Sequence, residues 1–132
     1  MLKTLRESED KVEFKEAKNG TFSYNGGDKA KPADRRRCIL GYVVAFCNEG
    51  GGSLVFGMHD KHPHKVVGTS LAQDGLGEVE NKIYRDTGIR PMIYELYEDE
   101  AAKRGRVLVV DVPGRPVGKV FKFEDVHLMR VG

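Results

Sequence analysis

The sequence has no long apolar run and few cysteines, and each shortage excludes a class of protein. No stretch approaches the roughly 18 apolar residues that a membrane-spanning helix needs, and the N-terminus lacks the hydrophobic segment of a signal peptide. Its two cysteines are too few for a disulfide-rich secreted scaffold. We therefore expect a cytoplasmic protein that does not associate with membranes.

The chain also has almost no net charge. A formal charge of +2 over 132 residues neither demands nor excludes a nucleic-acid partner, so any such argument depends on local clusters. The length is that of one compact domain. If Cys38 and Cys47 lie on one helix they are about 13 Å apart, too far for a disulfide, and we expect free, buried thiols.

Nucleotide-binding motifs are missing as well. A phosphate loop needs a lysine after its last glycine, but Gly52 is followed by Ser53 and Leu54. There is no Gly-x-Gly-x-x-Gly segment after a strand either. The sequence thus argues against an ATPase of the Walker type.

Hydrophobic periodicity predicts an α+β domain. Helical spacing indicates one helix opened by Pro32 or Asp34, running to about Cys47, and another over 76–87 with Gly88 as its C-cap. Strands are expected at 12–17, 53–58, 66–68, 92–97, 106–112 and 119–131. We predict a mixed, mostly antiparallel sheet of five or six strands packed with two or three helices.

The expected first strand has one apolar and one charged side. In residues 12–17, Val12 and Phe14 alternate with Glu13 and Lys15, which predicts a strand with the apolar pair inward and the charged pair outward. The chain stops straight after a predicted strand, at Gly132. Residues 1–132 are accordingly expected to be a single domain, the N-terminal module of a longer protein.

A helix that ends on glycines and turns at once into a strand is the most informative local pattern. The segment from Asn48 through Gly50, Gly51 and Gly52 tolerates positive φ, which a helix C-cap and a sharp reversal both need. By itself this is more often a structural turn. The same turn can also offer backbone amides to a phosphate.

Basic residues gather before and at the start of the first predicted helix. They suit contact with a phosphate backbone, and the alternative is a solvated face neutralised by Asp28 and Asp34. Phe22 and Tyr24 precede them and can stack on exposed bases. The candidate phosphate ligands are Lys29, Lys31, Arg35, Arg36 and Arg37.

Carboxylates form a second candidate site. They converge if strand 12–15 lies beside strand 53–58, and such acids can hold Mg²⁺ or Mn²⁺ in phosphodiester cleavage, with a lysine to neutralise the phosphate. The residues are Glu7, Glu9, Glu13, Asp60 and Lys15. Separately, His59, His62 and His64 can share a metal with Asp60, although loops rich in His and Lys are more often merely hydrated.

Taken together, these segments resemble the Schlafen AlbA_2 domain family, also called divergent AAA-4. The resemblance runs in family order along nearly the whole chain. Its landmarks are Glu7-Ser8-Glu9, Glu13-Phe14-Lys15-Glu16-Ala17, Ala45-Phe46-Cys47-Asn48, Gly51-Gly52, Gly57-Met58-His59-Asp60, Val67-Gly68, Val112-Pro113, Arg115-Pro116 and Arg130-Val131-Gly132.

The resemblance implies a DNA-binding or more general nucleic-acid-binding module of bacterial proteins of the transcriptional-regulator type, needing no cofactor. Some animal relatives are metal-dependent endoribonucleases, and on that alternative Glu13 and Asp60 match two of the metal-binding acids, with Mg²⁺ or Mn²⁺ as cofactor. Neither Glu7 nor Glu9 has the spacing of the first glutamate in those nucleases. A second alternative is a module for protein interaction or homodimerisation.

Overall fold

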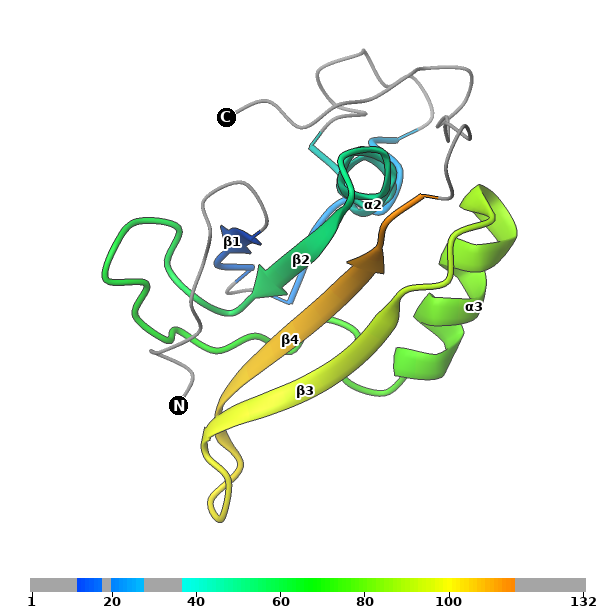
Figure 1. The fold of residues 1–132 in the computed structure, drawn as a ribbon. Helices are drawn as coiled ribbons and strands as arrows, with labels where there is room; N and C mark the ends of the chain where they lie inside the picture. Colours follow the sequence, from blue (N-terminus) through cyan, green and yellow to red (C-terminus); the bar gives the residue numbers. More distant parts are fainter. Residues whose placement is uncertain (1–11, 18–19, 28–36, 116–132) are drawn as a thin grey trace.

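A computed structural model of the chain describes residues 12–17, 20–27 and 37–115 (Figure 1). The strands are β1 (Val12–Lys15), β2 (Gly51–Phe56), β3 (Met92–Asp99) and β4 (Arg104–Pro113). The helices are α2 (Ile39–Asn48) and α3 (Leu76–Thr87). This α+β arrangement confirms the predicted fold class.

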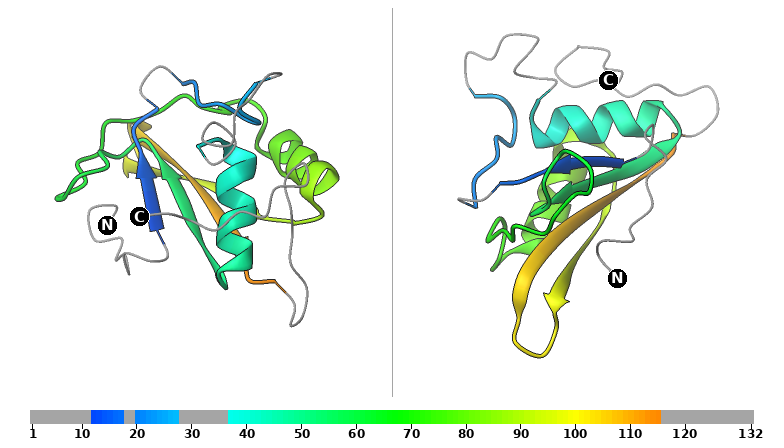
Figure 2. Two further views of the ribbon diagram at one scale, coloured as in Figure 1. Left: turned by 90° about the horizontal axis from the view of Figure 1, so that it is seen from above. Right: turned by 90° about the vertical axis from the view of Figure 1, so that its left-hand side faces the viewer.

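The strands form one sheet in the order β1-β2-β4-β3. β1 pairs parallel with β2, while β2 with β4 and β3 with β4 pair antiparallel, so the sheet is mixed. β3 and β4 make a long curved hairpin that projects beyond the helices (Figures 1 and 2).

The predicted number of strands was wrong for the described part of the chain, where the sheet has four. Residues 66–68 are no strand, since only Val66 makes an isolated bridge, to Met58. Gly57 and Gly68 have φ of 101° and 80°, and such left-handed backbone bends the chain away from a ladder. The strand expected at 119–131 lies outside the described residues.

Helix α2 begins later than the sequence predicted. Cys38 is its N-cap, with extended backbone, and its Sγ accepts a hydrogen bond of 3.3 Å from the Gly41 amide. Arg37 therefore precedes the helix rather than lying in its first turn. All ten residues of α2 are buried, as expected for a helix that is apolar on every side. Cys38 and Cys47 are free and buried, as predicted.

Both helices pack against one face of the sheet (Figure 2). Leu54 and Phe56 of β2 point to this face, together with Leu108 and Val110 of β4. Phe14 and Val55 point to the opposite face, where they cluster with Val107, Val109 and Met58. Helix α3 is amphipathic, and it ends at Gly88 with φ of 77°, the C-cap that was predicted. None of the helices in the described ranges is long and apolar enough to cross a bilayer.

Candidate functional site at the ends of β1 and β2

The parallel pairing of β1 and β2 brings two distant segments to one edge of the sheet. Lys15 lies opposite Phe56, and the Gly57 amide then donates a hydrogen bond of 2.8 Å to the Lys15 carbonyl. The carboxyl ends of the two strands therefore coincide, and the residues that follow each strand come together. The adjacency on which the predicted carboxylate site depends is therefore present.

The side chains of Glu13 and Lys15 lie on the helix-covered face, not outward as predicted. Lys15 Nζ lies 3.5 Å from Glu13 Oε2 and 5.3 Å from the centre of the Tyr42 ring on α2. Burial lowers the Lys15 pKa, but the hydrogen bond with Tyr42 and the charge of Glu13 outweigh burial and raise the pKa above its ordinary value. The ammonium group is thus held charged beneath α2.

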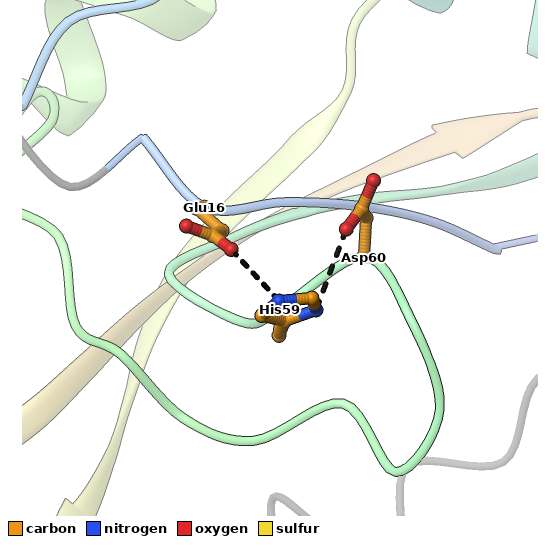
Figure 3. A group of neighbouring side chains, drawn as sticks. All are labelled: Glu16, His59 and Asp60. Carbon is orange, nitrogen blue, oxygen red and sulfur yellow. Dashed lines mark ion pairs between the residues drawn. The ribbon is translucent and has the colours of Figure 1, made fainter.

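The acid that lies near Asp60 is Glu16, not Glu13 as had been predicted (Figure 3). His59 Nε2 lies 3.3 Å from Glu16 Oε2, and His59 Nδ1 lies 3.4 Å from Asp60 Oδ1. One donor atom from each of these three side chains falls within 4.8 Å of the other two. Within the described ranges this is the group able to hold a metal ion, and it does not include Glu13.

The other two loop histidines have structural contacts instead. The His64 ring stacks on Phe14 with centroids 4.1 Å apart, and its Nδ1 lies 3.0 Å from the His59 carbonyl oxygen. The His62 ring meets His64 edge-on at 5.8 Å. Among the described residues, a site shared by all three imidazoles is therefore not assembled.

The glycine turn between α2 and β2 uses its amides within the fold. The amides of Glu49 and Gly50 donate to carbonyls of the last turn of α2. A Cβ on Gly51 would lie 2.8 Å from the Val112 carbonyl oxygen, so β4 fits closely beneath the turn. Arg115 Nε donates to the Asn48 carbonyl at 3.1 Å. Gly50, which is exposed, and the half-buried Gly52 complete the predicted set.

Few of the predicted phosphate ligands fall in the described part of the chain. Arg37 is exposed and makes no ion pair with another described residue. Lys29, Lys31, Arg35 and Arg36 lie outside the described residues, as do Glu7 and Glu9. Lys61 and Lys65 belong to the histidine-containing loop and were not predicted as ligands; both are exposed and likewise make no ion pair in the described structure.

The aromatic residues proposed to stack on bases pack against the protein. Phe22 meets Phe56 edge-on with ring centres 5.0 Å apart. Tyr24 donates a 2.7 Å hydrogen bond to Asp86, and Lys82 Nζ lies 4.0 Å above its ring. Both aromatics line a mostly apolar cavity of about 240 Å³ between this segment, the helices and the sheet. An apolar lining does not suit a phosphate backbone.

Sequence reasoning missed Glu16 and Tyr42. Glu16 follows the last residue of β1, where the side-chain alternation of a strand no longer applies, so its meeting with His59 had no signal in the sequence. Tyr42 lies on an apolar helix face and has the pattern of a core residue. His59 was noticed only as one of several loop histidines.

Comparison with known proteins gives both a family and a fold. A family model described as "Schlafen, AlbA_2" matches residues 8–132. The crystal structure of the DIP2311 protein from Corynebacterium diphtheriae matches with a TM-score of 0.61 at 22% identity over 93% of this chain and 24% of that one. This chain thus spans about a quarter of that protein, and the similarity shows the fold.

A second solved structure is the N-terminal domain of a RecG-related protein from Nitrosomonas europaea. It has a TM-score of 0.47 and 19% identity over 99% of this chain and 84% of that one. No curated protein matches the chain.

Proposed function

Because the chain belongs to the Schlafen AlbA_2 family, we propose that it is a nucleic-acid-binding module. The family match over residues 8–132 is the observation that carries this proposal. The finer proposal is a DNA-binding part of a bacterial protein of the transcriptional-regulator type. Binding by such a module needs charge and hydrogen-bond donors and no cofactor.

The proposed contacts are made mainly by cations. Arg37 is exposed and makes no ion pair within the described structure, so its guanidinium is available to a phosphate. Lys29, Lys31, Arg35 and Arg36 are proposed to act with it. The turn residues Asn48, Gly50, Gly51 and Gly52 are proposed as neighbouring contacts that fix the orientation of the backbone. Gly50 is the exposed member of that turn.

The experiment is a binding titration with labelled duplex DNA, single-stranded DNA and RNA. Replacing Arg35, Arg36 and Arg37 together by glutamine is expected to weaken binding at least about tenfold. The matched control replaces Arg85 and Arg90 by glutamine, because these helix-side arginines are engaged with Asp86 and Glu80. Equal losses in the two variants would contradict the assigned contacts, and no binding of any probe at low salt would contradict the function.

The enzymatic alternative is a metal-dependent endoribonuclease using Glu13, Asp60, Lys15 and Glu7 or Glu9. The adjacency of the ends of β1 and β2 favours it, since it brings Lys15, whose ammonium group can neutralise a phosphate, to the same edge of the sheet as Asp60. The described residues do not fit the implied metal set, because Asp60 meets Glu16 and His59 in a group without Glu13. Incubating structured RNA with Mn²⁺ decides the matter: cleavage that Glu13→Gln abolishes would establish it, and none would eliminate it.

The remaining alternative is a protein-interaction or homodimerisation module. β1 and β3 are the outer strands of the described sheet, and an outer strand can pair with another chain. A dimeric mass in gel filtration together with no shift of DNA or RNA at low salt would favour this alternative over nucleic-acid binding.

A further inference from the structure

We propose that Glu16, His59 and Asp60 bind one divalent transition-metal ion of the zinc class (Figure 3). The inference goes beyond nucleic-acid binding and does not depend on it. It also differs from the metal set implied by the family resemblance, because it uses Glu16 and His59 in place of Glu13. Hereafter these three residues are called the Glu16 cluster.

Distances between the donor atoms match those around a small metal ion. Ligands bound to zinc at about 2.0–2.2 Å in tetrahedral geometry are separated by about 3.3–3.6 Å. His59 Nε2 lies 3.3 Å from Glu16 Oε2, while Asp60 Oδ1 lies 3.4 Å from the other ring nitrogen, Nδ1. All three donors already lie within 4.8 Å, so the largest closure required is about 1.5 Å.

Exposure allows that closure and gives an ion access from solvent. The side chains of Glu16, His59 and Asp60 are 30%, 44% and 57% exposed. At this exposure water can complete the coordination shell of an ion. The backbone beneath them is fixed more firmly, since the His59 amide donates a 2.8 Å hydrogen bond to the Lys65 carbonyl.

The surroundings of both ring nitrogens of His59 are also compatible with a metal-bound, neutral imidazole. A neutral imidazole that gives one nitrogen to a metal keeps a proton on the other nitrogen, and that N–H usually donates to a carboxylate or carbonyl. His59 has a carboxylate beside each ring nitrogen, Glu16 at Nε2 and Asp60 at Nδ1. With the ion on one ring nitrogen, the carboxylate beside that nitrogen is the nearer ligand, and the other carboxylate completes the set by moving within the 4.8 Å that contains the three donors.

The donor set selects the class of ion. One imidazole with two carboxylates suits zinc and its neighbours in the first transition series, whereas Mg²⁺ and Ca²⁺ prefer all-oxygen shells. With a neutral ring the Glu16 cluster carries two negative charges within 4.8 Å of each other, which a divalent cation neutralises. We therefore expect Zn²⁺ to bind in preference to Mg²⁺.

The test titrates the metal-free 132-residue chain with Zn²⁺ and separately with Mg²⁺ by calorimetry, after removal of any affinity tag. About one Zn²⁺ per chain is expected. Glu16→Gln, His59→Gln and Asp60→Asn should each weaken Zn²⁺ binding about tenfold or more. His62→Gln and Glu13→Gln are the matched controls, a histidine of the same loop and a carboxylate of the strand that precedes Glu16, and are expected to leave affinity within about twofold.

A second measurement needs no variant. In ¹⁵N spectra of the histidine rings, Zn²⁺ should shift a nitrogen of His59 by more than those of His62 and His64. No Zn²⁺ binding, undiminished affinity in His59→Gln, or an unchanged His59 ring would each overturn the proposal. So would losses in Glu13→Gln and Asp60→Asn without a loss in Glu16→Gln, because the ion would then occupy the set implied by the family resemblance.

Discussion

The Gly57 amide donates a hydrogen bond of 2.8 Å to the Lys15 carbonyl, immediately past the last paired residues of β1 and β2. The Gly57 carbonyl in turn accepts from the amides of Val67 and Gly68 at 2.8 and 2.9 Å. Through these hydrogen bonds Gly57 joins the end of β1, the end of β2 and the loop that returns at Val67 and Gly68. The position of Glu16 relative to His59 depends on this junction.

We predict that Gly57→Ala destabilises the fold by about 2 kcal/mol or more. Gly57 has φ of 101°, and an added Cβ would lie 2.7 Å from the Arg106 carbonyl oxygen, so both strain and collision oppose alanine. Chemical denaturation measures the change. Gly77→Ala in α3 is the control: nothing lies within 4 Å of its added Cβ, and stability should be unchanged or higher. Equal stability of Gly57→Ala and the wild type would contradict the claim that this position requires glycine.

Arg106 holds the loop after Gly68 against the β3–β4 hairpin. It is 5% exposed, and it donates to Glu95 at 2.6 Å and to the carbonyls of Thr69 and Leu71 at 2.9 and 2.8 Å. A lysine cannot reproduce this fork of donors. Arg106→Lys is therefore expected to lower the free energy of unfolding by about 2 kcal/mol or more.

The matched control for that prediction is Arg104→Lys. Arg104 lies on the same strand, is exposed and makes no side-chain bond to a described residue. Its substitution should change stability by less than about 0.5 kcal/mol. The interpretation of Arg106 fails if the two variants have the same midpoint in urea.

The hydrogen bond from Tyr24 to Asp86 joins the 20–27 segment to α3 and makes stability depend on pH. The hydrogen bonds from Arg85 and then Tyr24 lower the Asp86 pKa below its ordinary value of 3.8. A carboxyl group with a lowered folded-state pKa stabilises fully above its unfolded pKa and loses this contribution as pH falls through the folded value. Wild-type stability should thus decline below about pH 4.

In Asp86→Asn that part of the acid-induced decline should be smaller, and at pH 7 this variant should be less stable by about 1 kcal/mol. Tyr24→Phe removes the 2.7 Å hydrogen bond and should give a loss of similar size at pH 7. Thermal unfolding between pH 2 and pH 7 measures both. Superimposable pH profiles for wild type and Asp86→Asn would show that this contact does not contribute.

Tyr42 is expected to determine the titration of Lys15. Its hydrogen bond and the Glu13 charge together raise the Lys15 pKa although burial opposes them. In Tyr42→Phe and in Glu13→Gln the Lys15 pKa should fall, as followed by the ¹⁵N shift of Nζ. An unchanged Lys15 pKa in Tyr42→Phe would mean that the ring does not hold the ammonium group.

Much of the fold was predictable because apolar residues recur at the spacing of a helix or form the continuous run of a buried strand. The apolar run of β2 and the helical spacing of α3 gave elements within a few residues of their true bounds, with Gly88 as the stop. The start of α2 was not predictable from the charged residues that precede it. The N-cap is Cys38, and cysteine is not a preferred N-cap residue. Val66 looked like a strand residue but has only one bridging partner.

The candidate site was less predictable than the fold. The adjacency of β1 and β2 was only a condition of the predicted carboxylate site, and which acid meets Asp60 depends on where β1 stops alternating. Glu13 lies on the helix-covered face by strand parity, while Glu16 lies just beyond the strand and reaches His59. A slip of one residue in the register of β1 would move Glu13 to the other face of the sheet.

The salt dependence of nucleic-acid binding tests the central claim most directly. Binding of a labelled DNA or RNA, followed by fluorescence anisotropy between about 50 and 200 mM salt, should weaken steeply, with a slope in log K against log salt of about −0.7 to −0.9 for each phosphate contacted. The slope should become shallower in the variant with Arg35, Arg36 and Arg37 replaced. A flat salt dependence, or no binding at the lowest salt, would contradict the account.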